Sequence, residues 1–470
     1  MLFSMTHLIP LGIALFDGAA VEAFAAAFAL TLFTGVMVWL PVRGLERDLR
    51  LRDGFLVVVA FWTVLGLYGA LPFMAMPGGM VFTDAVFESV SGLTTTGATV
   101  IIGIDELPLA VKYYRQQLQL LGGMGIIVLA VAILPMLGVG GMQLYRAETP
   151  GPMKDTKLTP RITETAKALW EVYMGLTVLC ALAYWVAGMT PFDALMHSFS
   201  TISTAGFSSY DASIGHWDSR AIEWVAIVFM LVGAINFGLH FAVARTGSLS
   251  GVLRYWQDPE TRAMLQIYGV MVVATAALLI VHRVHGSFGE SLTRAAFTVV
   301  SHATTTGFGL ASYSSWPTAL PFLMILVSFL GGVAGSTTGG LKIIRVLLLT
   351  KQGTREINRL VHPQAVVPVK LGRRAIPNTV IEAVWGFFSV YAAIMVAMTI
   401  LFMLSGFDQV TAFSAVAATL NNLGPGLGEI SSSFASAPGP AKWLGVFGML
   451  LGRLEIFTLL VVLTPAFWRR

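Results

Sequence analysis

The chain has 470 residues, of which 56% are hydrophobic and only 11% are charged, and its mean hydropathy is +0.76. Soluble domains carry about 25% charged residues, so this composition excludes an ordinary soluble protein. The net charge of +4 is too small to indicate a nucleic-acid partner, and the single cysteine, Cys180, cannot form an intrachain disulfide.

Apolar stretches that are long enough to cross a bilayer as helices follow one another along the chain. We predict a short N-terminal segment near 4–16 and longer helices near 20–42, 54–76, 116–145, 165–188, 221–244, 263–283, 318–349, 379–404 and 442–467. The predicted fold class is therefore an all-α polytopic membrane protein with about ten transmembrane segments.

Basic residues gather in the connections on one side of these predicted helices. Four segments and the C-terminal end hold 22 of the 29 Lys and Arg residues, and they are 43–53, 145–167, 245–262, 342–374 and the pair Arg469 and Arg470. Cytoplasmic loops of membrane proteins carry an excess of Lys and Arg. We therefore expect these segments and the C-terminus to be cytoplasmic.

The connections on the opposite side each contain an apolar piece that is too short to span, at 82–93, 191–202, 291–303 and 409–420. Length alone leaves two interpretations open, a re-entrant half-helix or an amphipathic helix outside the membrane. An internal repeat favours the first. Each piece is followed by a small polar phrase that ends in glycine, at Gly97, Gly206, Gly307 and Gly424, with spacings of 109, 101 and 117 residues.

The repeat extends beyond the glycines. Twelve residues before each glycine stands an alanine, and the residues three and two places before it are Thr94 and Thr95, Ser203 and Thr204, Thr304 and Thr305, and Asn421 and Asn422. Internal periodicity indicates a duplicated unit. The unit is helix, short pore helix, polar loop, helix. We divide the chain into an N-terminal helical addition at 1–45 and four repeats at 46–150, 151–248, 249–375 and 376–470.

Four re-entrant loops in one chain can surround a central ion pore. Glycine adopts backbone conformations that other residues disfavour, and a ring of carbonyl and hydroxyl oxygens can replace the water shell of an alkali cation. The negative ends of the four short helices would point at the same place and favour a cation. Helix packing alone explains scattered small residues in membrane helices, but it does not explain a fourfold repeat at positions that do not span.

Two further features lie inside predicted spans. The stretch 331–340, "GGVAGSTTGG", interrupts the helix at 318–349 and is either a packing kink or an element beneath the loops. Arg453 lies within the last span, where a charge is costly and faces either a water-filled cavity or a partner on another helix. Glu455 is two residues further on and is expected to point elsewhere. Glu88 and His197 lie on the first two short helices. Asp84 and Asp193 lie near the starts of these helices, and helix capping is the preferred interpretation for them.

The chain resembles the Trk/Ktr/HKT superfamily of potassium transporters, and within it the TrkH branch. The stretches that carry the resemblance are "SGLTTTGAT", "FSTISTAGF", "SHATTTGFG", "TLNNLGPGLG", "LGGMGIIVLAVAILPMLGVGGMQLYRAETPGP" at 121–152, "GGVAGSTTGGLKIIR" at 331–345 and "LGRLEIF" at 451–457. The first of two N-terminal helices typical of the branch is shortened here, and the fourth loop is the least like the others.

The resemblance implies a function for particular residues. The potassium-binding selectivity filter would be Thr94, Thr95, Thr96 and Gly97, Ser203, Thr204, Ala205 and Gly206, Thr304, Thr305, Thr306 and Gly307, and Asn421, Asn422, Leu423 and Gly424. The gate would be formed by Arg453 and by Gly331, Gly332, Gly335, Ser336, Thr337, Thr338, Gly339 and Gly340. The resemblance also implies a homodimer in a bacterial inner membrane, controlled by a cytoplasmic nucleotide-binding subunit, TrkA.

The sequence therefore predicts potassium uptake, with potassium as substrate, no covalently bound cofactor, and membrane lipid and a regulatory subunit as partners. A sodium-permeable member of the same fold is one alternative. A secondary transporter of an organic solute is another, although it predicts inverted repeats. No catalytic motif indicates an enzyme. Proton-coupled symport, passive flow and nucleotide-controlled opening all remain open.

Overall fold

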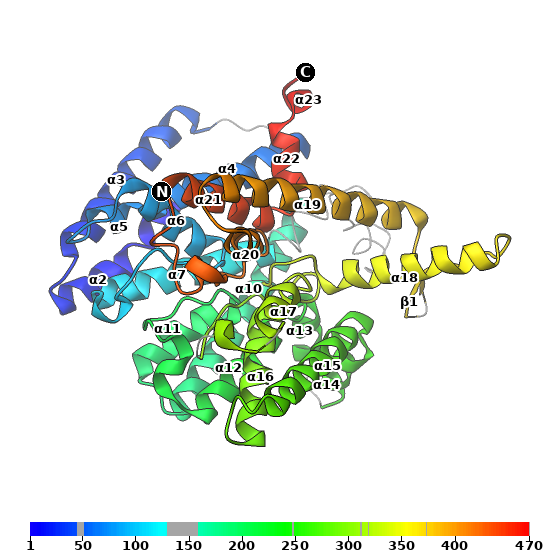
Figure 1. Cartoon of the computed structure of the whole chain (residues 1–470). Helices are drawn as coiled ribbons and strands as arrows, with labels where there is room; N and C mark the ends of the chain where they lie inside the picture. The colour runs from blue at the N-terminus through cyan, green and yellow to red at the C-terminus, as the bar shows by residue number, and fades with distance from the viewer. Residues whose placement is uncertain are drawn as a thin grey trace.

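The computed structural model describes residues 1–44, 51–128, 158–246, 249–310, 313–317, 319–372 and 374–469. Within these residues the chain is helical, apart from one antiparallel hairpin of β1 (Lys370–Leu371) and β2 (Arg374–Ala375). Most helices gather around a common centre, and α18 (Ile343–Val361) projects from the body (Figure 1). Much of the helix expected at 116–145 and most of the basic segment 145–167 lie outside the described residues.

The N-terminal addition consists of α1 (Leu2–Met5), α2 (Leu8–Asp17) and α3 (Val21–Trp39), followed by the 3₁₀ turn η1 (Leu40–Val42). The chain reverses between α2 and α3 through two left-handed residues, Gly18 and Ala20. The segment expected at 4–16 is thus two short helices rather than one. Because α2 packs against α7 as well as α3, the addition lies against the first repeat.

The remaining helices follow the predicted order of units, with the 3₁₀ turns η2 (Ile104–Glu106), η4 (Ser213–Trp217), η5 (Tyr313–Ser315) and η6 (Gly428–Ile430) after the short helices. The first two repeats contain α4 (Leu51–Gly69), α5 (Leu71–Ala75), α6 (Phe82–Leu93) and α7 (Leu109–Val128), then α10 (Leu158–Val186), α11 (Pro191–Ile202), α12 (Arg220–Gly233) and α13 (Phe237–Ala244). The last two contain α14 (Leu249–Gln257), α15 (Pro259–Val281), α16 (Phe288–Ala303), α17 (Leu320–Val327) and α18, then α19 (Asn378–Leu404), α20 (Gln409–Leu420), α21 (Gly439–Arg453), α22 (Phe457–Leu463) and α23 (Pro465–Trp468).

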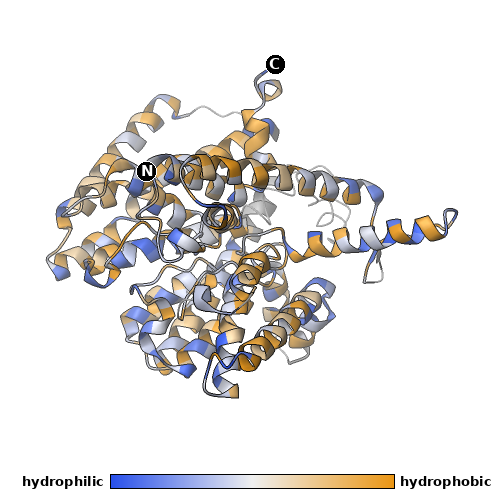
Figure 2. Ribbon diagram, in the orientation of Figure 1, coloured by the Kyte–Doolittle hydropathy of each residue, from blue (hydrophilic) through white to orange (hydrophobic). Residues whose placement is uncertain are grey.

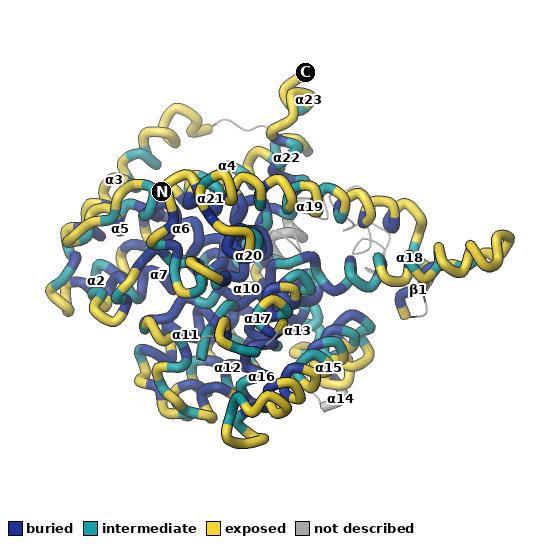
Figure 3. The backbone as a smooth tube through the Cα atoms, in the orientation of Figure 1, coloured by how far each residue is buried: buried dark blue, intermediate teal, exposed yellow. Residues whose placement is uncertain are grey.

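The four short helices α6, α11, α16 and α20, here called the pore helices, lie in the interior. Three have 12 residues and α16 has 16, so at a rise of about 1.5 Å per residue none crosses a hydrocarbon core of about 30 Å. Nearly every residue in their last two turns is buried, and the tube of α20 is dark blue in Figure 3. Side-chain N-caps at Thr190, Ser287 and Asp408 start three of them.

Five helical segments are long and apolar enough to cross a membrane, and two bent helix pairs raise the number to seven within the described residues. The five are Val21–Val42, Arg52–Ala75, Ala166–Val186, Pro259–Val281 and Asn378–Leu404. Apolar residues run along the outward faces of α3, α4 and α19 (Figure 2). The protein therefore has the outer surface of a membrane-embedded helical bundle.

Two helices that we predicted as continuous are each broken by a sharp bend, so these two predictions were wrong. The segment at 221–244 bends by 98° between α12 and α13, because the Asn236 side chain accepts the amides of Gly238 and Leu239 and starts a new helix. The segment at 442–467 bends by 114° between α21 and α22, where Glu455 and Ile456 adopt positive φ. The helix expected at 318–349 is interrupted between α17 and α18, and α18 continues to Val361.

Candidate functional site

The four polar loops that follow the pore helices share one backbone conformation. The first loop residue ends its helix with φ between −74° and −84°. The second is left-handed in every loop, with φ of 51° at Thr95 and Thr204 and 53° at Thr305 and Asn422. The left-handed region is strained for a β-branched residue, and such outliers cluster at functional sites.

The fourth loop residue is the repeated glycine, and it too is left-handed in every loop. Its φ is 79° at Gly97, Gly206 and Gly307 and 97° at Gly424. The internal sequence repeat therefore corresponds to a structural repeat at the level of individual backbone angles.

The loop amides are bonded back to their own pore helix. In the first loop, Thr96 N donates to the Ser91 carbonyl at 2.9 Å, and the third residues of the other loops make the same bond at 2.8–2.9 Å. Hydroxyls are also engaged locally, because Thr94 Oγ1 donates to Val90 O at 2.7 Å and lies 2.8 Å from Thr96 Oγ1. The third loop repeats this arrangement at Thr304 and Thr306. These loop donors are thus bonded to their own pore helices or to one another.

The loops close into a ring. A Cβ atom added at Gly97 would lie 2.0 Å from the Ala205 carbonyl oxygen, one at Gly206 2.0 Å from that of Thr306, and one at Gly307 2.1 Å from that of Leu423. At Gly424 the corresponding neighbour is the Thr96 carbonyl oxygen, at 2.7 Å. Each glycine therefore lies against the third residue of the next loop, and the fourth loop returns to the first. Only glycine allows this approach.

The glycine-rich stretch 331–340 lies directly against three of the four loops. Thr337 Oγ1 lies 3.1 Å from Thr204 Oγ1 in the second loop. Gly339 N donates to Thr305 Oγ1 in the third loop at 2.7 Å, and Gly340 N donates to the Asn421 carbonyl in the fourth at 3.2 Å. The stretch is thus placed at the side of the ring where the pore helices end.

The other residues of this stretch give it a fixed shape. Gly331, Gly335 and Gly340 are left-handed, with φ of 61°, 79° and 71°. Thr338 Oγ1 accepts from Gly332 N at 2.9 Å and lies 2.9 Å from Ser336 Oγ. The segment is therefore an ordered loop rather than a kinked helix.

Arg453 meets the same loop from the end of α21. It is buried, and its Nη1 donates to the Thr337 carbonyl at 3.2 Å, whereas its Nε and Nη2 have no partner among the described residues. Within those residues no carboxylate forms an ion pair with Arg453, and Glu455 pairs instead with Arg345. A positive side chain therefore lies beside the loop, close to the ring.

Sequence reasoning missed several residues that hold the loop in place. The Tyr268 hydroxyl lies 2.8 Å from the Ala303 carbonyl oxygen and 2.6 Å from the Gly331 carbonyl oxygen, within hydrogen-bonding distance of both, and so joins the third pore helix to the start of the loop. Glu260 Oε1 accepts the amide of Ala334 within the loop at 2.8 Å and that of Ile344 beyond its end at 3.1 Å. Tyr268 and Glu260 lie far from the loop in the sequence, so no local sequence pattern indicates that they contact it.

The capping interpretation of two acidic residues was wrong. Asp84 lies in the first turn of α6 but forms an ion pair with Lys442 of α21 at 2.8 Å. The cap of α11 is Thr190, whose hydroxyl accepts the amide of Asp193 at 3.1 Å. Both acidic residues still lie at the positive ends of their helix dipoles.

These features define a class of protein: a helical membrane protein in which four short pore helices of one chain are each followed by a polar loop, and the four loops close into a ring. The family model TrkH, described as a cation transport protein, matches residues 20–469. The chain is 55% identical over 471 residues to the Trk system potassium uptake protein TrkH of Vibrio parahaemolyticus and 54% identical to that of Escherichia coli, covering all of this chain and 97% of each relative.

A solved structure is similar to this chain over its whole length. The crystal structure of the potassium transporter TrkH from Vibrio parahaemolyticus superposes with a TM-score of 0.92 at 52% identity, over 100% of this chain and 97% of that chain. The Escherichia coli protein TrkG is 40% identical over 473 residues. The chain belongs to the TrkH family of cation transport proteins.

Proposed function

We propose that this protein takes up potassium through the ring, which acts as a selectivity filter. The observation that carries the proposal is the closure of four loops of matching backbone angles around one centre, each glycine against the next loop. The relatives named above are potassium uptake proteins. A filter of this kind strips the water from a cation and replaces it with fixed oxygens.

The hydrogen bonding of the loops supports a cation as the substrate. The third-residue amides donate into the pore helices, so these amides are not available to bind an anion between the loops. The pore helices end at Leu93, Ile202, Ala303 and Leu420, immediately before the loops. Helix C-termini carry partial negative charge and favour cations.

The loop at 331–340 is proposed as the gate. It contacts three of the four filter loops, and Arg453 adds a positive charge beside it. A cation that leaves the filter at this side meets a packed, hydrogen-bonded segment. Passage therefore requires the loop to move, and opening breaks the bonds between it and the filter loops.

The proposed partners are a second copy of the chain, membrane lipid and a cytoplasmic nucleotide-binding subunit. Helix α18 supports a docking role because it projects from the body and exposes Ile357, Leu360 and Val361 beside basic residues (Figure 1). The basic segments favour a cytoplasmic C-terminus in the inner membrane, and the division into an N-terminal addition and four repeats follows the four pore helices.

Rubidium uptake into vesicles that contain the purified protein tests the proposal. We expect uptake that potassium inhibits far more strongly than sodium. Equal inhibition by the two ions would favour the sodium-permeable alternative, and saturable exchange of an organic solute without rubidium uptake would contradict the proposed function. Repeating the assay with and without a proton gradient separates symport from passive flow.

A further inference from the structure

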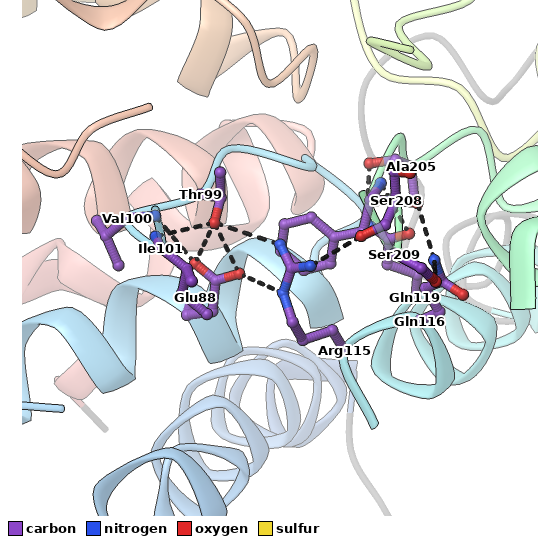
Figure 4. A network of polar contacts seen from close by, with 11 residues as sticks. Glu88, Thr99, Val100, Ile101, Arg115, Gln116, Gln119, Ala205, Ser208 and Ser209 are labelled. Carbon is purple, nitrogen blue, oxygen red and sulfur yellow. Dashed lines mark hydrogen bonds and ion pairs between the residues drawn. The ribbon is translucent and has the colours of Figure 1, made fainter. Parts of the chain in front are cut away.

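A buried ion pair lies behind the filter, between α6 and α7. Arg115 Nε donates to Glu88 Oε1 at 2.8 Å, and the two side chains are 1% and 0% exposed. Burying two charges is costly unless their remaining hydrogen-bonding positions are filled. Here they are filled, and the partners are backbone and side-chain groups of two filter loops (Figure 4).

The ion pair joins the outgoing segments of the first and second loops. Glu88 accepts from Thr99 Oγ1 at 2.9 Å and from Val100 N at 3.0 Å, just after Gly97. Arg115 Nη1 donates to the Ser208 carbonyl at 2.9 Å, two residues after Gly206. The guanidinium also stacks over Phe207, with its centre 4.2 Å from the ring centroid. One arginine thus sets the separation of the two segments.

Gln119, one helical turn along α7 from Arg115, holds the second loop at the filter itself. Its Nε2 donates to the Ala205 carbonyl at 2.8 Å, and its Oε1 accepts from Phe207 N at 3.2 Å. These two bonds clamp the backbone on both sides of Gly206 (Figure 4). The Ala205 carbonyl is also the atom that approaches Gly97, so Gln119 fixes the contact between the first two loops.

Among the described residues, this kind of support is found at the first two loops. The residue nine places before the filter glycine is Glu88 in the first repeat and His197 in the second, and each contacts the residue two places after the glycine, Thr99 and Ser208. In the third and fourth repeats the corresponding pairs are Thr298 with Gly309, and Ala415 with Gly426. The outgoing segments of the third and fourth loops are held differently: Ser301 Oγ donates to the Phe308 carbonyl and Tyr313 Oη donates to the Gly426 carbonyl, each at 2.8 Å. The ion pair and Gln119 therefore act on the first two loops.

We propose that Arg115, Glu88 and Gln119 are positioning residues for ion selection. Acting from behind the filter, they fix the spacing of the first and second loops, and this spacing sets how closely the filter oxygens surround a dehydrated cation. A wider spacing leaves the filter less able to discriminate potassium from sodium. The inference rests on the proposed function of the ring as a potassium filter.

The test is rubidium uptake by the full-length protein in vesicles, with potassium and sodium as competitors. Gln119→Met removes both clamping bonds at similar volume. We expect sodium to compete about three- to tenfold better relative to potassium, the effect of one or two hydrogen bonds, and the KM for rubidium to rise more than the maximal rate falls. Lower thermal stability with an unchanged ratio would overturn the proposal, because a purely structural role predicts that result.

A second variant tests the ion pair. Arg115→Met alone leaves Glu88 as an unpaired buried charge and risks misfolding, so the double variant Glu88→Gln, Arg115→Met is used. The matched control is Asp84→Asn with Lys442→Met, which removes an ion pair of the same pore helix that contacts no filter residue. We expect reduced discrimination in the first double variant and wild-type discrimination in the control.

Gly97→Ser in the same assay distinguishes a failure of the positioning proposal from a failure of the filter assignment. If this variant loses discrimination while Gln119→Met and the Glu88 and Arg115 double variant keep it, the filter stands and the positioning proposal is refuted. If Gly97→Ser also keeps it, the filter assignment itself has failed.

Discussion

The ring geometry predicts that the four filter glycines differ in their tolerance of a methyl group. Alanine at Gly206 places Cβ 2.0 Å from the Thr306 carbonyl oxygen, whereas alanine at Gly424 places it 2.7 Å from that of Thr96. Ordinary carbon–oxygen contacts begin at about 3.3 Å. The neighbouring loop must therefore retreat by roughly 1.3 Å in the first case and by roughly 0.6 Å in the second.

The left-handed backbone adds a cost of about 1–2 kcal/mol for any residue other than glycine. This cost is common to both positions, so it cannot produce a difference between them. Gly103 is the matched control, because its φ is 75° but no atom lies within 4 Å of an added Cβ. Binding sites tolerate displacements of about 0.5 Å, so the retreat at Gly206 exceeds the tolerance and the retreat at Gly424 is close to it.

The assay is rubidium uptake at equal amounts of folded protein in vesicles. We expect Gly206→Ala to lose uptake by about tenfold or more, equivalent to at least about 1.4 kcal/mol, and Gly424→Ala to lose a few-fold. Gly103→Ala should lower thermal stability and leave uptake near that of the unmodified protein. Equal losses at Gly206 and Gly424, or a comparable loss at Gly103, would refute the reasoning.

Three other substitutions probe the filter and the gate. Gly97→Ser should relax discrimination against sodium, because its Cβ pushes against the Ala205 carbonyl; sodium competition measures this, and unchanged selectivity would remove the first loop from the filter. Arg453→Ala should raise rubidium flux by removing a charge and the bond to the Thr337 carbonyl, and a folded variant with only reduced flux would show that the gate interpretation is wrong. Thr337→Val should raise flux up to about fivefold, because it removes a hydroxyl whose one proton is shared between the Ile202 and Gly233 carbonyls at 3.0 and 3.1 Å, a loss of about 1 kcal/mol; flux at or below the unmodified level would contradict this prediction.

The repeated elements were predictable because they leave a periodic trace in the sequence. A short apolar helix followed by a small polar phrase and glycine recurs four times, and the structure gives the four copies matching backbone angles. The two bent spans were not predictable in the same way. Both segments are long and mostly apolar, so each was predicted as one span, and their breaks depend on a side-chain cap at Asn236 and on positive φ at Glu455 and Ile456.

The residues behind the filter were missed for a different reason. Arg115 lies immediately before the helix predicted at 116–145, and Glu88 was noted only as a residue of the first short helix. Their roles depend on contacts between segments far apart in the chain, such as the bond from Gln119 to Ala205, 86 residues away. Local patterns report which face of a helix is buried, but they do not report which distant loop that face meets.

The return of the fourth loop to the first has a consequence for biosynthesis. The contact between Gly424 and the Thr96 carbonyl completes the ring only when the last quarter of the chain has entered the membrane. A chain whose synthesis stops earlier has three of the four loops, and the contact that closes the ring is missing. Chains that end before the fourth repeat therefore lack one of the four loops and cannot close the ring.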